Sequence, residues 1–305
     1  MACFNSTSSP WNRTDEKSYY HAAYTQAMKI ICPLGIVISL LGLGGNGLVL
    51  FFLVCTVKRD SFSVFLFHLA LADFSLLACL VVDFMGEIFA YFHNICFPLP
   101  YLNLFFLISY VAGLCLVVAI SLGRCLSVFF PIWYRLHSPK YTSTIVCVLT
   151  WVWAISISVL GRMFCDYDLI DNKLCGPLFK WFCLFIIVIL SATLLCTVIM
   201  LLKIKCSSRV RPPRKLYIAV ALTAVSLVSL ALPMLGPFLP DNPHIPYDNK
   251  LISLFSCVNS SVNPLVYYFA GRMGRQRRHL RLREVFQRAM GEEVDPSSGA
   301  SGHST

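Results

Sequence analysis

Long apolar runs separated by short polar segments dominate this chain. A helix needs roughly 20 consecutive, mainly apolar residues to cross the hydrocarbon core of a bilayer. Seven segments meet that requirement: residues 29–56, 62–86, 101–129, 142–163, 178–203, 216–239 and 249–270. The second and the seventh contain polar residues within the run, and the seventh is the least apolar of the set. The pattern predicts an all-α protein, a bundle of seven transmembrane helices.

The composition supports a membrane environment. Of the 305 residues, 57% are hydrophobic and 13% are charged, and this charged fraction is roughly half of that in soluble domains. A water-soluble core of this size could not cover so much apolar surface, so the excess must face the lipid bilayer. Most of the 14 cysteines lie inside apolar runs, where cysteine behaves as a small buried hydrophobic residue.

The distribution of Lys and Arg predicts the orientation of the bundle. If the N-terminus is outside the cell, 18 of the 25 basic residues fall on the cytoplasmic side, as the positive-inside rule requires. We therefore expect a multi-pass plasma-membrane protein whose membrane domain spans residues 29–271, with a cytoplasmic C-terminus. The net charge of +10 then faces anionic lipid headgroups, and nucleic acid is not an expected partner.

The first 28 residues form a polar segment that we expect to be extracellular. They lack the apolar core of a cleavable signal peptide, so the first membrane helix must direct insertion. Asn5 and Asn12 each begin an Asn-x-Ser/Thr sequon, and both are predicted glycosylation sites.

The C-terminal region divides into two parts. In residues 272–291, apolar side chains recur at helical spacing among arginines, which predicts an amphipathic helix on the cytoplasmic membrane surface. Residues 292–305 have low hydrophobicity and are predicted to be disordered. Their serines are candidates for phosphorylation that recruits arrestin, or the segment is an ordinary disordered tail.

Polar residues inside the membrane are costly and are therefore functional candidates. They are Asn46 in the first segment, Asp73 in the second, and Asn259, Ser260 and Asn263 in the seventh, which also contains Pro264. In a bundle they can converge on an interior cluster in which hydrogen bonds satisfy Asp73. The residues alone leave open whether that cluster is functional or a structural network that joins the helices.

Several motifs resemble those of the rhodopsin-like (class A) G-protein-coupled receptors, in the same order. They are GNGLV at 45–49, LALAD at 69–73, Arg124 at the inner end of the third segment, Trp151, and NPLVY at 263–267. The resemblance covers about residues 27–290. The stretches 121–141 and 258–271 are similar to those of the Mas-related receptors, and the Cys165/Cys175 pair resembles the disulfide of that subfamily.

This resemblance implies a receptor that binds an extracellular peptide or small molecule and, in response, activates a heterotrimeric G protein. Arg124 would contact the G-protein α subunit, and Tyr267 would swing inward to stabilise the open form. Asp73, Asn259 and Asn263 would form a polar hinge, around a sodium ion held at Asp73. No other metal and no cofactor is implied.

Some residues depart from the family pattern. Gly123 replaces the acidic residue that usually pairs with the motif arginine, which predicts raised basal activity. Gly113 stands where a sodium-coordinating serine is often found, and Ala231 replaces a tryptophan of the sixth segment. The fifth segment contains no tyrosine. Together with Gly123 and Ala231, this keeps an alternative open: a receptor-like membrane protein without its own G-protein signalling, acting as a heteromer partner or ligand scavenger.

The sequence also bears on the ligand. Phe106 and Cys257 occupy the positions where amine receptors carry an aspartate and opsins carry the retinal lysine, so neither ligand class is expected. Phe106 and Tyr110 share one helical face and either line the floor of a pocket or pack as core. The seven histidines are scattered and form no catalytic or metal-binding motif, which argues against an enzyme.

Charged residues near the outer helix ends are the remaining pocket candidates. Asp83 and Glu87 are four residues apart and share a helical face, where a basic peptide or small cation could bind them. They could equally be solvated charges at the rim, paired with Lys250 or with Arg162.

Overall fold

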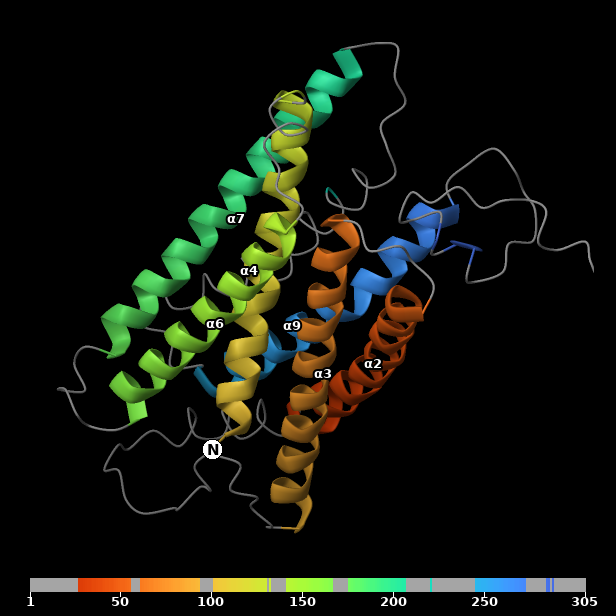
Figure 1. The fold of residues 1–305 in the computed structure, drawn as a ribbon. Helices are drawn as coiled ribbons and strands as arrows, with labels where there is room; N and C mark the ends of the chain where they lie inside the picture. Colours follow the sequence, from red (N-terminus) through yellow and green to blue (C-terminus); the bar gives the residue numbers. More distant parts are fainter. Residues whose placement is uncertain are drawn as a thin grey trace, which may run out of the picture.

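The computed structural model describes residues 27–55, 61–93, 101–130, 132, 141–166, 175–206, 220, 245–272, 284, 285 and 287. Every element assigned within them is helical (Figure 1). A π-helical turn, η1 (Ala27–Ile31), precedes six α-helices: α2 (Cys32–Cys55), α3 (Ser61–His93), α4 (Leu102–Phe129), α6 (Thr142–Asp166), α7 (Cys175–Cys206) and α9 (Ile245–Arg272). The predicted span 216–239 and amphipathic helix 272–291 fall almost entirely outside the described residues, and the sequons fall wholly outside them.

The all-α prediction is confirmed, and so is the prediction of membrane-spanning helices. Within the described part of the chain, four helices are long and apolar enough to cross a bilayer: Lys29–Cys55, Ser61–His93, Leu102–Ser127 and Thr142–Met163. The helix α3 continues seven residues past the predicted end at 86. A shorter apolar stretch, Ile186–Ile199, lies within α7.

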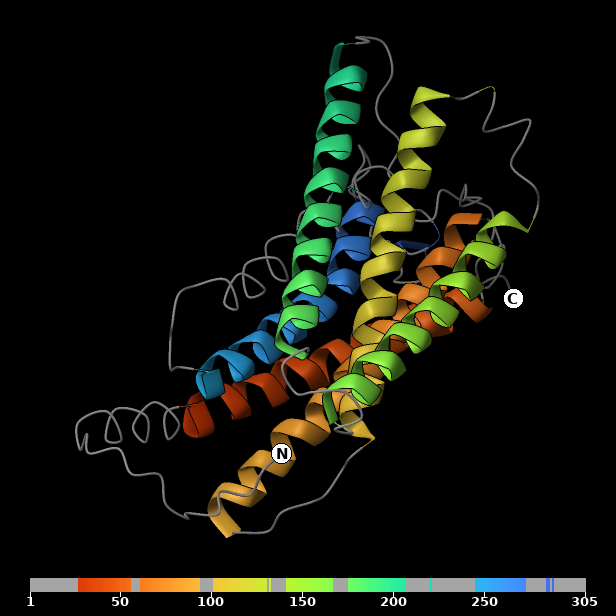
Figure 2. The same cartoon turned by 90° about the vertical axis from the view of Figure 1, so that its left-hand side faces the viewer.

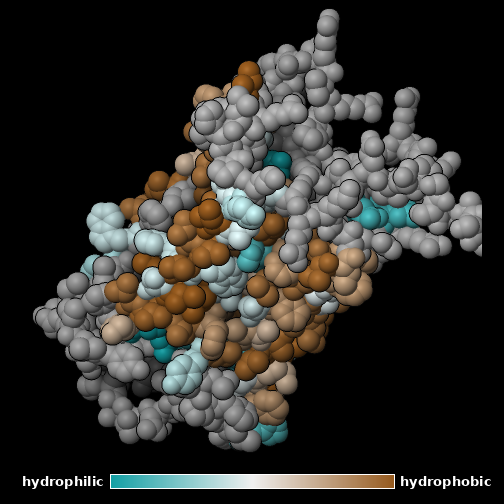
Figure 3. All heavy atoms as spheres, in the orientation of Figure 1, coloured by the Kyte–Doolittle hydropathy of each residue, from teal (hydrophilic) through white to brown (hydrophobic). Residues whose placement is uncertain are grey.

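The helix α2 illustrates how the sequence divides between protein and lipid. Its buried residues follow each other at alternating intervals of three and four, which places them on one face of an α-helix. They are Cys32, Gly35, Ser39, Gly42, Asn46, Val49 and Leu53. Large apolar side chains such as Leu41 and Phe51 occupy the opposite face and are exposed. Apolar residues spread over much of the visible surface (Figure 3), as expected for helices that contact lipid.

Small residues on the buried face of α2 allow its backbone to approach two neighbouring helices. A methyl group added at Gly35 would overlap with the ring of Phe84 on α3. A methyl group added at Gly42 would overlap with the hydroxyl of Ser261 on α9. Close backbone approach through glycine is a common way to pack membrane helices, because apolar side chains gain little by leaving lipid.

The helix α3 is central in the bundle. It contacts α2, α4, α6 and α9, and Figures 1 and 2 place it between α2 and α4. The helix α7 packs against α4 and α6 on the far side, and α9 packs against α2. Residues from α2, α3, α4 and α9 therefore supply most of the buried core, and the polar residues predicted from the sequence lie among them.

Candidate functional site

A short hydrogen bond joins the second and seventh predicted segments in the middle of the bundle. The amide Nδ2 of Asn263 donates to Oδ2 of Asp73 across 2.6 Å. Asp73 on α3 is only 3% exposed and Asn263 on α9 only 1%, so both side chains are shielded from bulk water and hydrogen-bond to each other instead. A carboxylate acceptor makes the bond stronger than one between neutral groups. The structure therefore brings two of the predicted residues together.

A proline in α9 explains the position of Asn46. Pro264 lies inside α9, and proline has no N–H to donate to the carbonyl four residues earlier. That carbonyl belongs to Ser260, and Nδ2 of Asn46 on α2 donates to it across 3.0 Å. The same amide nitrogen also donates to the carbonyl of Gly42 at 3.0 Å. Asn46 thus satisfies a backbone oxygen that would otherwise be unpaired in a medium without water.

A small cavity lies beside the Asp73–Asn263 bond, between α3, α4 and α9. It is lined by Leu69, Asp73, Leu76, Ser109, Tyr110, Gly113, Leu114, Val117, Asn259, Ser260 and Asn263. Its space of about 10 Å³ for the centre of a water molecule is close to the minimum that holds one ordered water. Among the described residues, Oδ1 of Asn263 is buried without a hydrogen-bond partner. The cavity therefore offers oxygen atoms to a small polar guest.

The hydroxyl of Ser109 is a member of this site that the sequence analysis missed. Gly113 leaves space beside α4, since a methyl group added there would meet none of the described residues within 4 Å. Ser109 lies one helical turn earlier on α4, is 4% exposed, and lines the same cavity. The turn-by-turn spacing of a helix, counted back from Gly113, could have identified it.

Tyr267 lies one turn after Asn263 on α9. Its side chain is fully buried, and its hydroxyl has no hydrogen-bond partner within the described residues. A buried tyrosine hydroxyl is normally hydrogen-bonded. The hydroxyl of Tyr267 can therefore still donate and accept a hydrogen bond if the helices rearrange.

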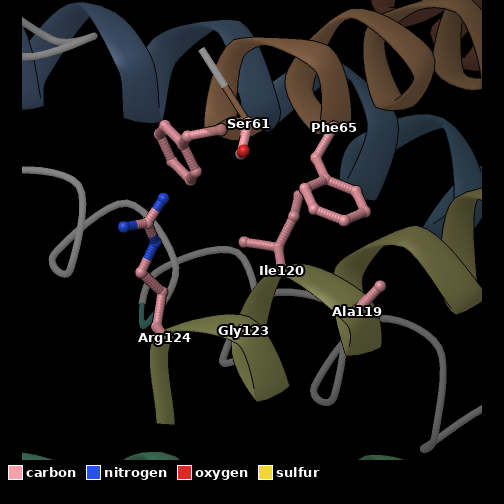
Figure 4. Close-up of a pocket in the computed structure, with 7 residues that line it drawn as sticks. Ser61, Phe65, Ala119, Ile120, Gly123 and Arg124 are labelled. Carbon is pink, nitrogen blue, oxygen red and sulfur yellow. The ribbon is translucent and has the colours of Figure 1, made fainter. Parts of the chain in front are cut away.

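Arg124 lies near the end of α4, beside the first turn of α3. Its guanidinium carbon Cζ is 4.2 Å from the centroid of the Phe62 ring. Figure 4 shows the Arg124 side chain extending from α4 towards α3, across a cavity lined by Ser61, Phe62, Phe65, Ala119, Ile120, Gly123 and Arg124. Within the described part of the chain, a methyl group added at Gly123 would meet nothing within 4 Å, so no described residue fills the position of the missing acid.

The opposite end of the bundle carries an ion-pair cluster; we call it the outer end, following the predicted orientation. Nζ of Lys250 on α9 is 3.0 Å from Oδ2 of Asp83 and 3.1 Å from Oε1 of Glu87 on α3. These side chains are 15–18% exposed. Of the two interpretations left open by the sequence, the structure contains the pairing with Lys250. Arg162 is partly exposed near the end of α6.

The aromatic pair on α4 connects this end to the central cavity. The rings of Phe106 and Tyr110 are stacked, with centroids 6.0 Å apart and planes 17° apart. Tyr110 is buried at 5% exposure and lines the cavity beside Asp73, whereas Phe106 is only partly buried. The predicted shared face is therefore present.

Two further polar contacts between helices were not predicted. Nε1 of Trp151 on α6 donates to Nδ1 of His68 on α3 across 3.3 Å. The Oγ of Ser39 on α2 and the Sγ of Cys257 on α9 are 3.0 Å apart. His68 is an ionisable residue inside a membrane segment, so the rule that identified Asp73 could also have identified His68. The side chains of Cys165 and Cys175 lie outside the described part of the structure.

Comparisons with known proteins agree with the geometry. Residues 36–214 match the model of the serpentine type 7TM GPCR chemoreceptor Srx family. The human Mas-related G-protein coupled receptor MRG is 34% identical over 279 residues, which cover 90% of this chain and 73% of the relative. The rat Mas-related G-protein coupled receptor member B4 is 32% identical over 98% of this chain and 95% of its own. The rat member A is 35% identical over 84% of this chain and 87% of its own.

Proposed function

Because this chain belongs to the Mas-related G-protein coupled receptors, we propose that a peptide or small molecule binds at its outer end and that Arg124 contacts the G protein. Membership of this family implies that the chain is a multi-pass membrane receptor and that its partners are a G protein and a ligand. The direction of the helices, the ligand class and the roles of single residues are part of the proposal.

The Asp73–Asn263 hydrogen bond is the observation that carries this proposal. It joins α3 to α9 at 2.6 Å, beside a cavity that α4 also lines. A ligand that shifts the outer ends of these helices must change the geometry of this bond. The inner end of α4, where Arg124 lies, would respond because the same helix lines the cavity. This is a two-state equilibrium, in which ligand and G protein both favour the open state.

A sodium ion fits the chemistry of the central cavity. Carboxylate, amide and hydroxyl oxygens are the donors that hard cations prefer. The ion would be held by Asp73 together with Ser109, Asn259, Ser260 and Asn263, which line the cavity. The buried Oδ1 of Asn263, which has no partner among the described residues, supports this. When bound, the ion supplies a positive charge that balances Asp73 and favours the closed packing around it.

We propose that Tyr267 stabilises the open state. Its buried hydroxyl has no partner within the described residues, so the closed state leaves its hydrogen-bonding capacity unused. An inward shift of α9 would give it partners among backbone or water, and that gain favours opening. Asn46 and Pro264 would allow the shift, because a helix bends most readily at an internal proline, and the carbonyl of Ser260 that Pro264 leaves without a helical donor accepts from Nδ2 of Asn46.

The outer cluster favours a ligand that carries a positive charge. Asp83 and Glu87 share one ammonium group, that of Lys250, so the three charges sum to −1. A cationic group on a peptide or small molecule would complete the balance, with Phe106 and Tyr110 as an aromatic floor and Arg162 at the edge. Glycans at Asn5 and Asn12, a Cys165–Cys175 disulfide and arrestin binding by the tail belong to the same proposal.

The experiment that tests the proposal compares wild type with Arg124→Ala at equal surface level. Calcium and cAMP are measured in cells, both at rest and against a panel of peptides and amines. Lys29→Ala, which removes an exposed basic side chain from η1, is the matched control. We expect Arg124→Ala to abolish basal and ligand-evoked signals, with the control unchanged. Identical output from all three chains would favour a partner that does not signal by itself.

A further inference from the structure

We propose that the ring of Phe62 holds Arg124 in the closed state, in the role that an acidic neighbour fills in related receptors. The proposal rests on the proposed contact of Arg124 with the G protein. Phe62 is then a positioning residue, since it acts through Arg124 and not by touching ligand or G protein.

The contact has the geometry of a cation–π interaction. Arg124 Cζ lies 4.2 Å from the centroid of the Phe62 ring, well inside the range of about 6 Å over which such pairs attract. Phe62 is 2% exposed, so its ring is held by packing and is a fixed partner for the guanidinium group. Because α3 and α4 run in opposite directions, the first turn of α3 meets the last turns of α4.

The sequence around Arg124 explains why a ring is used here. Gly123 has no side chain and so cannot pair with Arg124. A methyl group added at Gly123 would meet no described residue within 4 Å, so the space beside it is open to a larger side chain. The residue at position 62 lines the same cavity as Gly123 and Arg124. The ring of Phe62 therefore offers Arg124 a restraint from the neighbouring helix, where position 123 of its own helix offers none.

Opening of the inner end would separate Arg124 from the ring. Partly desolvated cation–π pairs correspond to a factor of about 2 to 30 in an equilibrium constant. Removing the ring should raise the ratio of open to closed receptor by that factor. Gly123 alone predicts high basal activity, and the ring of Phe62 lowers it to a level that its removal should reveal.

The first arm of the test measures basal second-messenger signal at equal surface level in Phe62→Leu. The matched control is Phe65→Leu, because Phe65 lines the same cavity and Figure 4 shows its ring on the side away from Arg124. We expect basal signal to rise about 2- to 30-fold in Phe62→Leu and to stay near wild type in the control. Equal signals in the two variants would overturn the proposal.

The second arm separates the ring's electrostatic role from its packing. Phenylalanine with one, two or three fluorine atoms, introduced at position 62, keeps nearly the same shape while weakening attraction for a cation. Basal signal should rise stepwise with fluorination, and a flat series would contradict a cation–π restraint. In Phe62→Leu, adding Gly123→Glu should return the signal towards wild type, because the open space can admit a carboxylate beside Arg124.

A third arm distinguishes failure of this proposal from failure of the proposed function. If Arg124→Ala leaves every signal unchanged, Arg124 does not act on the G protein. The contact between Phe62 and Arg124 is then tested separately, by measuring thermal unfolding of the purified protein. Phe62→Leu, Arg124→Ala and the double variant form a cycle. Non-additive losses support the restraint, and additive losses overturn it.

Discussion

Removing the ammonium group of Lys250 should destabilise the bundle by leaving the carboxylates of Asp83 and Glu87 without that counter-charge. Lys250 bridges Asp83 at 3.0 Å and Glu87 at 3.1 Å, and these side chains are only 15–18% exposed. The change we consider is Lys250→Met, which keeps most of the aliphatic length of the side chain and removes the charge.

The magnitude follows from burial. Breaking a fully buried ion pair costs about 3–5 kcal/mol, because the remaining charge is left without a partner in a poor solvent. Here about one-sixth of each side chain reaches solvent, which screens part of that cost, while the two carboxylates on adjacent turns repel each other. We therefore expect Lys250→Met to lower the free energy of unfolding by about 2–4 kcal/mol.

The assay uses the cysteines of the chain. Cys147 and Cys257 are fully buried thiols outside any disulfide, so a dye that fluoresces on reacting with thiols reports unfolding of protein purified in detergent. Lys250→Met should lower the unfolding midpoint by several degrees, and Lys29→Met, which removes an exposed lysine, should not. Adding Glu87→Gln to Lys250→Met should recover part of the loss. A midpoint equal to wild type in Lys250→Met would refute the reasoning.

Three further expectations follow from the packing of the helices. Gly42→Ala should cost about 1–3 kcal/mol by overpacking, because its methyl group would overlap with Ser261, and the same dye assay should detect it. His68→Leu should cost about 1–3 kcal/mol, since it leaves the indole N–H of Trp151 without its acceptor, whereas His68→Asn should retain most of the stability. Asn46→Ala should lower the midpoint similarly by orphaning the carbonyl that Pro264 leaves free, and unchanged surface expression and midpoint would contradict it.

The sequence predicts the helices well because the bilayer imposes one dominant requirement. Apolar length identifies α2, α4 and α6 to within a few residues, and the buried face of α2 follows from intervals of three and four residues. The seventh segment was the weakest by hydropathy, and α9 is indeed absent from the helices that meet the membrane criterion among the described residues. Its polar residues serve contacts inside the bundle, such as that of Asn263 with Asp73.

Contacts between segments were harder to predict, for a physical reason. The pairing of Arg124 with Phe62 depends on how far α4 slides along α3, and the pairing of Lys250 with Asp83 depends on the register of α9. Glycines on α2 set how closely α2 packs against α3 and α9, but no property of one segment alone encodes the registers of α4 and α9 along α3. Polar residues within a membrane segment can still be identified from the sequence as candidates for a functional site. Phe62 cannot be identified in this way, because the sequence does not distinguish its ring from other apolar residues of the core.

The helix α3 contacts α4 or α9 through charged or polar side chains at three levels along its length. Phe62 meets Arg124 near one end, Asp73 meets Asn263 in the middle, and Glu87 meets Lys250 near the other end. With a rise of about 1.5 Å per residue, these contacts extend along about 38 Å of a continuous helix. Two of them hold α9 and one holds α4, so α3 cannot shift against either neighbour without straining a polar contact. A ligand that draws Glu87 away from Lys250 would therefore loosen α9 at the outer end first, and Asp73 and Phe62 would determine how far that change reaches Arg124.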